Sequence, residues 1–218
     1  TTRNFARRPA DLAFSILSLL KHDPLIKNLL LEENFATSLK EANSIIVCLD
    51  KIKLLHHLMR VCPLPDLRLE RFFVNMRSLL LTNLDNIKTS PELIYFLSTL
   101  SLQSFTNEYV YLENNEETKL IKNLETEIME TLAKSDQLEA KKILCLASYR
   151  PLHQYNWSPK LKDLDNLEEV KSRLIEEPFN ERAIVSKIPM LGEILDNVSN
   201  KVRSQYEENP YPRWVKIG

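Results

Sequence analysis

SPELIYFLSTLSLQSFTNEYVYL, residues 90–112, carries a plain helical signal. The Ser90 side chain can cap a helix, and Pro91 suits the first helical position because the N–H that proline lacks would be unpaired there in any case. Apolar residues then recur at helical spacing towards Phe105. We therefore expect a helix that begins at Ser90 and runs through this stretch.

The second half of the stretch breaks the apolar pattern. Asn107, Glu108, Tyr109 and Tyr111 bring polar groups into an otherwise aliphatic helix, which local rules disfavour. One interpretation is a buried hydrogen-bond network, and the other is contact with a substrate or a partner through Asn107, Glu108 and Tyr109. We expect Glu108 to be at least partly buried and hydrogen-bonded, because its helix is apolar on both sides of it.

Signals for helix starts recur along the chain. Asp23 precedes Pro24, and Asp66 precedes another run of apolar residues at helical spacing. Aspartate at such a position accepts hydrogen bonds from the first backbone N–H groups of a helix. Asp136 and Glu139 resemble a capping box ahead of a further apolar run. We expect helices to begin at each of these points.

The coarse organisation follows from the same periodicity. Residues 43–61 read as one helical segment that stops before Pro63, and sustained period-two alternation is missing from the sequence. The prediction is an all-α fold, an irregular antiparallel helical bundle with an extended C-terminal tail. We divide the chain into a helical body, residues 1–150, and a linker, final helix and leader, residues 151–218. This second part either packs back on the body or bridges to something beyond it.

Charge excludes several classes of partner. The chain has 218 residues, with 29 Lys and Arg against 30 Asp and Glu, so no overall positive field attracts nucleic acid or anionic lipid. The basic run RNFARR, residues 3–8, fits a solvated arm better than a binding patch. No stretch reaches the roughly 20 apolar residues that a membrane span requires. We expect a cytoplasmic protein that binds neither nucleic acid nor membrane.

The low numbers of cysteine and glycine exclude several kinds of site in this chain. The three cysteines, Cys48, Cys62 and Cys145, are far apart in the sequence and fit a reducing cytosol better than a disulfide framework or a zinc site. Cys145 falls in an apolar helix and is expected to be a core residue. The two glycines, Gly192 and Gly218, cannot form the glycine-rich loop of a nucleotide-binding motif within this chain.

No catalytic or metal-binding set stands out among the titratable residues. His56 and His57 are adjacent, so on a helix they point about 100° apart and cannot share a metal. His153 could act as a base, but no nucleophile with an orienting acid accompanies it. Glu116 and Glu117 form one of several carboxylate pairs that we expect at solvated faces or helix ends.

The tail concentrates large side chains. Prolines at 210 and 212 favour an extended backbone over residues 205–214, QYEENPYPRW. Tyr211, Arg213 and Trp214 are then presented on a stiff segment. Aromatic and arginine side chains anchor interfaces and stack on flat ligands, so we expect the tail to dock on a partner.

The tail also resembles a known family. VRSQYEENPYPRW, residues 202–214, is similar to the signature that precedes the cofactor-binding domain in a family of bacterial S-adenosylmethionine-dependent methyltransferases, many of which carry N-terminal tetratricopeptide repeats. Residues 54–81, 100–117 and 188–214 resemble the family's helical region, its Asn-Glu-Tyr-Val segment and its linker, in the same order. The repeats are missing here or reduced to the first helices.

The resemblance implies a division of labour within a longer protein. The family's next element is a strand with a glycine-rich loop, and this chain reaches Gly218 before it. These residues are then a non-catalytic helical domain of a class I methyltransferase, which supports substrate binding or frames the active site. Its expected partners are its own catalytic domain and a protein or peptide substrate.

The resemblance also gives the tail a role in the intact protein. It implies that Tyr206, Tyr211, Arg213 and Trp214 contact S-adenosylmethionine there, although the same residues could instead join two domains. This chain alone is expected to bind no cofactor and to be inactive. The first rival is a free-standing helical module for protein–protein interaction. The second is an enzyme with a small active site near His153.

Overall fold

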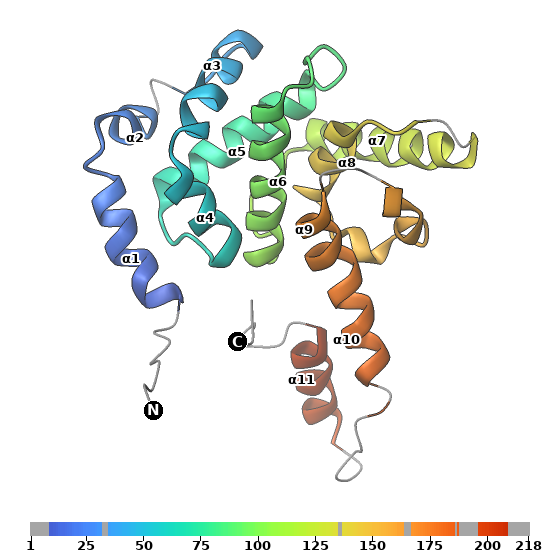
Figure 1. The fold of residues 1–218 in the computed structure, drawn as a ribbon. Helices are drawn as coiled ribbons and strands as arrows, with labels where there is room; N and C mark the ends of the chain where they lie inside the picture. The colour runs from blue at the N-terminus through green and yellow to red at the C-terminus, as the bar shows by residue number, and fades with distance from the viewer. Residues whose placement is uncertain are drawn as a thin grey trace, which may run out of the picture. The chain divides into compact units, whose positions relative to one another are not determined.

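The computed structural model describes residues 9–31, 35–134, 137–163, 167–185, 187 and 196–208. In these ranges the chain forms helices and connections without any strand, which confirms the predicted all-α class (Figure 1). Two compact units are present, residues 1–178 and 179–218. None of the helices in the described ranges combines the length and the apolar character needed to cross a bilayer.

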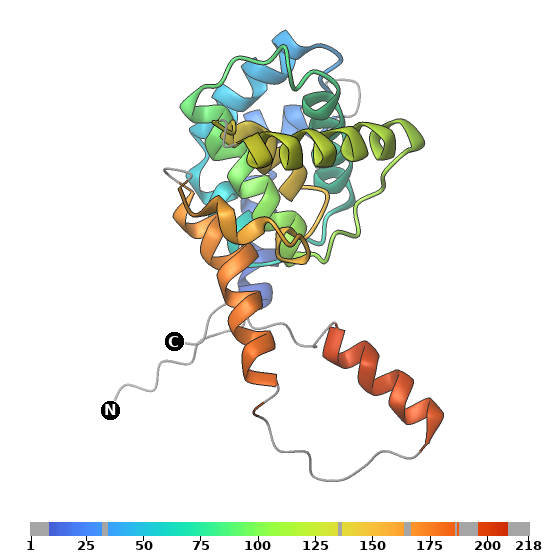
Figure 2. The ribbon, with the colours of Figure 1, turned by 90° about the vertical axis from the view of Figure 1, so that its right-hand side faces the viewer.

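The first unit holds most of the helices. Its helices α1 to α8 span Pro9–Leu20, Pro24–Leu29, Leu39–Asp50, Lys53–Val61, Leu67–Thr82, Pro91–Thr106, Asn115–Lys134 and Ala140–Ala147. Two 3-10 turns, Leu152–Gln154 and Ser158–Asp163, lead to α9, Glu168–Lys171. A π-helical turn, Ser172–Glu176, joins α9 to α10, Glu177–Val185 (Figure 2). The boundary between the two units falls within α10, after Pro178. The second unit contains α11, Asn197–Glu208.

The middle helices contact one another in two rows. Helices α3, α5 and α7 pack in that order, as do α4, α6 and α8, and α6 also contacts α3 (Figure 1). Helices also pack between the rows, α3 on α4, α7 on α8 and α5 on α8. The helices and their connections differ in length, which agrees with the lack of a fixed repeat in the sequence.

Three of the predicted helix starts are confirmed. Oδ1 of Asp23 accepts a hydrogen bond from the N–H of Leu25 at 2.8 Å. Asp66 and Ser90 cap α5 and α6 in the same way, each with a bond to the third residue of its helix. Each bond satisfies a backbone N–H that has no partner within the helix.

Two details of the sequence prediction are wrong. Residues 43–61 do not form one helix, because α3 ends at Asp50 and α4 begins at Lys53. The expected capping box also fails, because α8 begins after Glu139, whose side chain makes no capping hydrogen bond. Asp136 lies outside the described residues. If Asp136 were the cap, the helix would begin at residue 137. It begins three residues later, at Ala140, so the capping-box spacing does not match the helix start.

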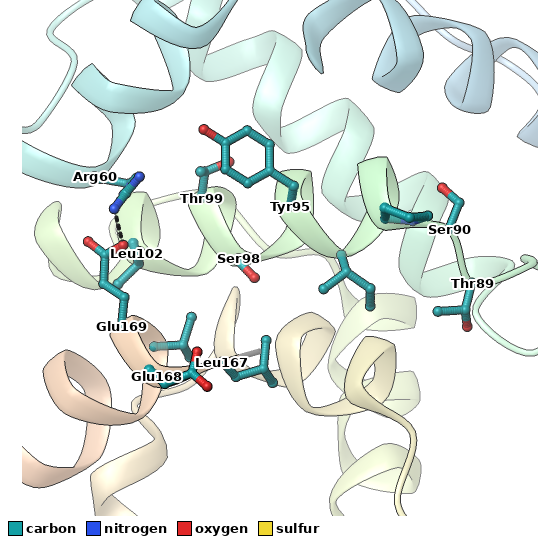
Figure 3. Close-up of a pocket in the computed structure, with 13 residues that line it drawn as sticks. Arg60, Thr89, Ser90, Tyr95, Ser98, Thr99, Leu102, Leu167, Glu168 and Glu169 are labelled. Carbon is teal, nitrogen blue, oxygen red and sulfur yellow. Dashed lines mark ion pairs between the residues drawn. The ribbon is translucent and has the colours of Figure 1, made fainter. Parts of the chain in front are cut away.

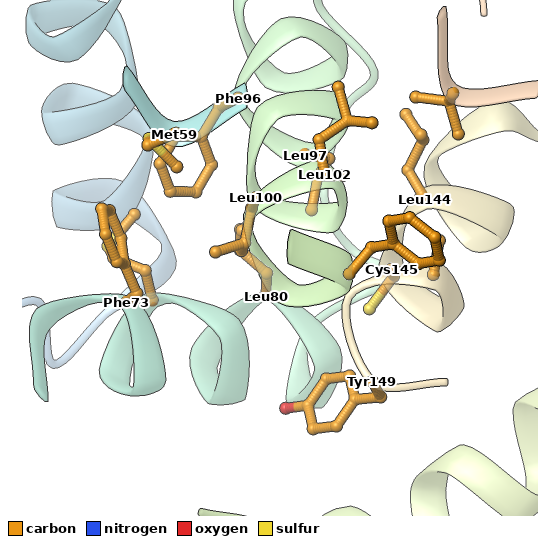
Figure 4. Packing of buried hydrophobic residues seen from close by; sticks show 14 of the residues in the cluster. Met59, Phe73, Leu80, Phe96, Leu97, Leu100, Leu102, Leu144, Cys145 and Tyr149 are labelled. Atoms are coloured by element: carbon orange, nitrogen blue, oxygen red, sulfur yellow. The ribbon is translucent and has the colours of Figure 1, made fainter. Parts of the chain in front are cut away.

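Helix α6 runs through the centre of the core. Its side chains Phe96, Leu97, Leu100 and Leu102 are fully buried. Figure 4 shows them between Met59 of α4, Phe73 and Leu80 of α5, and Leu144 and Cys145 of α8. Burial of each large apolar side chain contributes about 1.5–3 kcal/mol. Cys145 is a buried core thiol, as expected.

The chain beyond residue 150 packs back on this core as far as Pro178. Its buried apolar side chains belong to the same cluster as those of α6: Leu152, Trp157, Leu161, Leu167, Val170, Leu174 and Ile175. Of the two alternatives for the second part of the chain, packing back therefore holds for this portion.

Candidate functional site

The end of α6 has a specific backbone geometry. Beyond the last helical residue, Thr106, the N–H of Tyr109 donates to the carbonyl of Ser104 at 2.8 Å, and the N–H of Glu108 donates to that of Phe105 at 3.2 Å. This pair of bonds is the Schellman arrangement that ends many helices. The arrangement requires a left-handed residue after the cap, and Glu108 takes that place with φ 61°.

The expectations for Glu108 were therefore wrong. The helix stops at Thr106 instead of running to Leu112, and the Glu108 side chain is exposed. Tyr109 also has a positive φ, 58°. Glycine usually fills such positions, because any Cβ crowds the left-handed backbone. Two left-handed residues in succession turn the chain away from the helix axis, which carries the Glu108 side chain to the surface.

After this turn the side chains alternate between inside and outside. Tyr111 is buried, whereas Val110 is 67% exposed and Leu112 is 77% exposed. Glu108, whose backbone is left-handed, is exposed as well. We call the three exposed residues Glu108, Val110 and Leu112 the ridge.

A buried arginine holds the ridge from beneath. Arg77 of α5 is 2% exposed, and its Nη2 donates to the carbonyl of Leu112 at 2.7 Å. Its Nη1 donates to the carbonyl of Ser148 at 3.2 Å. The guanidinium carbon lies 3.9 Å from the centre of the Tyr149 ring. Carbonyl oxygens and the ring face together compensate the buried positive charge.

The start of α7 adds a second fixed point. Asn114 Oδ1 accepts from the N–H of Glu117 at 2.9 Å, and Glu117 Oε2 accepts from the N–H of Asn114 at 2.9 Å. This is a reciprocal capping box. Glu117 is only 3% exposed, and its Oε1 accepts from the hydroxyl of Tyr149 at 2.6 Å. Burial is the main reason that the pKa of Tyr149 is raised.

An ion pair between Arg150 and Glu113 fixes the chain directly after the ridge. Both guanidinium Nη atoms of Arg150 donate to the Glu113 carboxylate, at 2.6 and 2.8 Å. Thr118 Oγ1 donates to the same carboxylate at 2.7 Å. The Arg150 hydrogen bonds lower the pKa of Glu113. A bidentate pair of this kind fixes geometry as well as charge.

The structure brings the three predicted contact residues together at one helix end. Asn107 caps α6, and its Oδ1 is buried without a hydrogen-bond partner in the described part of the chain. Tyr109 is half-buried, with its ring edge-on to Phe105 at 6.5 Å. Of the three, only Glu108 faces the solvent.

The predicted tail residues are not placed. Tyr206 belongs to α11, but its side chain is outside the described residues, as are Tyr211, Arg213 and Trp214 entirely.

Two of the histidines, His56 and His153, make contacts within the fold. His56 is buried, with Nδ1 2.9 Å from Thr99 Oγ1 and Nε2 3.2 Å from the Leu49 carbonyl oxygen. His153 lies edge-on to Phe105 at 6.3 Å. No group of three or more His, Cys, Asp or Glu residues in the described ranges could hold a metal ion.

Sequence reasoning missed the network under the ridge. Arg77, Glu117 and Tyr149 come from three different helices or their ends, so no local pattern joins them. One signal was present, because Asn114 and Glu117 have the spacing of a capping box. That signal could have shown where α7 begins and that Glu117 turns back to the backbone.

Comparisons with protein-family models, with curated proteins and with solved structures find no match to this chain.

Proposed function

We propose that these residues form a non-catalytic helical domain of an S-adenosylmethionine-dependent methyltransferase, and that the ridge contacts the catalytic domain of the intact protein. The observation that carries the docking contact in this proposal is the ridge. Val110 and Leu112 are exposed aliphatic side chains on either side of the buried Tyr111, on a backbone held by a hydrogen bond from Arg77.

The physics of association favours such a feature as a contact point. A segment that is already ordered loses little conformational entropy when it docks. Aliphatic side chains that leave water on docking contribute about 25 cal/mol per Å² of apolar area. Hence the αL turn and the Arg77 bonds, which position the ridge, would serve the contact as well as the fold.

The methyltransferase part of the proposal rests on the resemblance of residues 202–214 to the leader of that family. The cofactor would supply an activated methyl group in the catalytic domain. Tyr206, Tyr211 and Trp214 suit stacking on the adenine or the sulfonium, and Arg213 suits pairing with the carboxylate. The described helices carry no glycine-rich loop, so no step of the reaction is assigned to them.

A second candidate is a free-standing module whose ridge binds another protein in trans. The exposure of Val110 and Leu112 favours it equally, since a docking surface need not belong to the same chain as its partner. In that case the ridge would be complete without a catalytic domain downstream.

The reading frame after the Gly218 codon separates the two candidates. We expect a coding sequence that continues into a strand followed by a glycine-rich G-x-G turn. A stop codon without such an element would contradict the methyltransferase proposal and support the module.

Calorimetry of the chain itself provides the matching biochemical test. Titration with S-adenosylmethionine should give no measurable heat of binding, because the helical domain offers no close backbone approach to the cofactor. The protein extended through the downstream domain should bind. A dissociation constant near 1 μM for the isolated chain, about −8 kcal/mol, would overturn the division of labour.

A further inference from the structure

A groove follows one face of α6 on the first unit. It has a volume of about 640 Å³ and lies between α6, the beginning of α9 and Arg60 at the end of α4 (Figure 3). Pockets of about 300–1,000 Å³ commonly hold ligands. We call it the α6 groove.

Aliphatic side chains line both walls of the groove, with the hydroxyl groups of Ser98 and Thr99 between them on α6. Pro91, Ile94 and Leu102 come from α6 at helical spacing, and Leu167 and Val170 come from the opposite wall. From Pro91 to Leu102 the helix rises about 16 Å. An extended peptide of about five residues has the same length.

Three charged side chains line the groove: Arg60, Glu168 and Glu169. Arg60 is paired with Glu169, and Arg173 lies 3.7 Å from the same carboxylate. Glu168 lines the groove next to this cluster and is exposed. In the described ranges no cation forms an ion pair with Glu168. Lys53, which lies 4.6 Å over the ring of Tyr95, is paired with Asp50 at 2.7 Å.

Several hydroxyl groups line the groove, on Thr89, Ser90, Tyr95, Ser98 and Thr99. Ser98 is on the face of α6 that looks towards Leu167 and Glu168, as Figure 3 shows. A serine hydroxyl can both donate and accept a hydrogen bond, so it can pair with either group of a peptide backbone. The groove therefore offers apolar side chains, the Ser98 hydroxyl as a partner for a peptide backbone, and the exposed carboxylate of Glu168.

We propose that the α6 groove binds an extended peptide that carries a lysine or arginine between apolar residues. The basic side chain pairs with Glu168, the apolar neighbours pack on Ile94 and Leu167, and Ser98 bonds the peptide backbone. Charge complementarity selects this occupant, because the groove presents an unpaired carboxylate beside apolar surface. The inference does not depend on the methyltransferase proposal and holds for this chain alone.

The test uses fluorescence anisotropy with a defined probe. The probe is fluorescein-labelled Gly-Leu-Lys-Leu-Gly, and the same peptide with Glu in place of Lys is its control. The lysine peptide should bind saturably, and the glutamate peptide at least about tenfold more weakly, since it places like charges together. Equal binding of the two peptides, or no saturable binding up to about 1 mM, would overturn the proposal.

Two variants locate the site. Glu168→Gln should weaken binding of the lysine peptide about two- to fivefold, as expected for an exposed ion pair, and Glu116→Gln on the surface of α7 should not. Ser98→Trp should fill the groove and abolish binding, with Thr126→Trp on α7 as the control for a large exposed side chain. If Glu168→Gln and Glu116→Gln behaved alike, the peptide would be bound elsewhere. Because the assay uses only this chain, its failure would leave the methyltransferase proposal untouched.

Discussion

Glu108 holds a backbone conformation that its side chain disfavours. Its φ of 61° is left-handed, and this region costs a residue with a Cβ about 1–2 kcal/mol. The side chain is exposed and so gains little from burial. Burial of the side chain does not offset this backbone strain. The strain therefore fits a role for the turn in presenting the ridge.

Substitution of Glu108 should separate backbone strain from side-chain contacts. Glu108→Gly should raise the free energy of unfolding by about 0.5–1 kcal/mol, because glycine relieves the strain and loses part of the gain through its freedom in the unfolded chain. Glu108→Ala should change it by less than about 0.5 kcal/mol. Urea unfolding followed by circular dichroism measures both. A loss above 1 kcal/mol in the alanine variant, as a buried network requires, would show that the side chain has a structural partner.

His56 makes stability depend on pH. Burial lowers its pKa from the ordinary value of 6.5 to about 4, because the charged form loses hydration. Between these values the unfolded chain binds a proton that the folded chain does not. Stability therefore falls as the pH drops through this window, by roughly 2–3 kcal/mol from this residue.

The control lies one residue away. His57 is on the exposed side of α4, so His57→Gln should keep the wild-type dependence of stability on pH. His56→Gln should flatten that dependence between pH 4 and 6.5, whatever its effect on stability at pH 7. Urea titrations at several pH values check this. Equal slopes in wild type and His56→Gln would refute the role of His56.

Residues could be predicted from the sequence where their role is local. Asp23, Asp66 and Ser90 cap helices through hydrogen bonds to backbone N–H groups two or three residues away. Their residue type and their position before the apolar run are enough to predict this role. Arg77 and the bond between Glu117 and Tyr149 could not be predicted, because these partners lie at least 32 residues apart in the sequence. A buried charge of this kind becomes evident only when the fold brings its partners together.

At the scale of elements, helix starts were easier to predict than helix ends. Proline and capping side chains mark starts, whereas ends are most often marked by glycine, and this chain has only two. The end of α6 at Thr106 was missed for that reason. The break between Asp50 and Lys53 was missed because no breaker residue lies there.

Arg77 links α5 to the residue after α8, Ser148, and to the ridge at Leu112. Its two Nη groups donate to both carbonyls at once. Arg77→Lys keeps the charge but cannot reach the carbonyls of Ser148 and Leu112 together. We expect it to lower the free energy of unfolding by about 2–4 kcal/mol, because it leaves buried acceptors without donors.

Arg68→Lys is the matched control for this substitution. Arg68 is exposed on the same helix, so the change should stay within about 0.5 kcal/mol. Urea unfolding gives both values. A loss below 0.5 kcal/mol for Arg77→Lys would mean that a lysine or water replaces the guanidinium without cost.

At the scale of the whole molecule, periodicity was sufficient for the all-α class. The two rows of helices could not be deduced, because they depend on contacts between helices that are distant in the sequence. The same limit applies to the α6 groove, whose walls come from α4, α6 and α9. The surface row of Val110 and Leu112 was hidden for another reason, since the expected helix would have placed these two residues on different faces.

Hydrogen–deuterium exchange of residues 107–113 in the isolated chain and in the intact protein tests the central claim most directly. If the ridge contacts the catalytic domain, this peptide should exchange more slowly in the intact protein, while the connection between α5 and α6, residues 83–89, exchanges equally in both. Equal exchange of residues 107–113 in the two proteins, with protection elsewhere on the helical domain, would contradict the account.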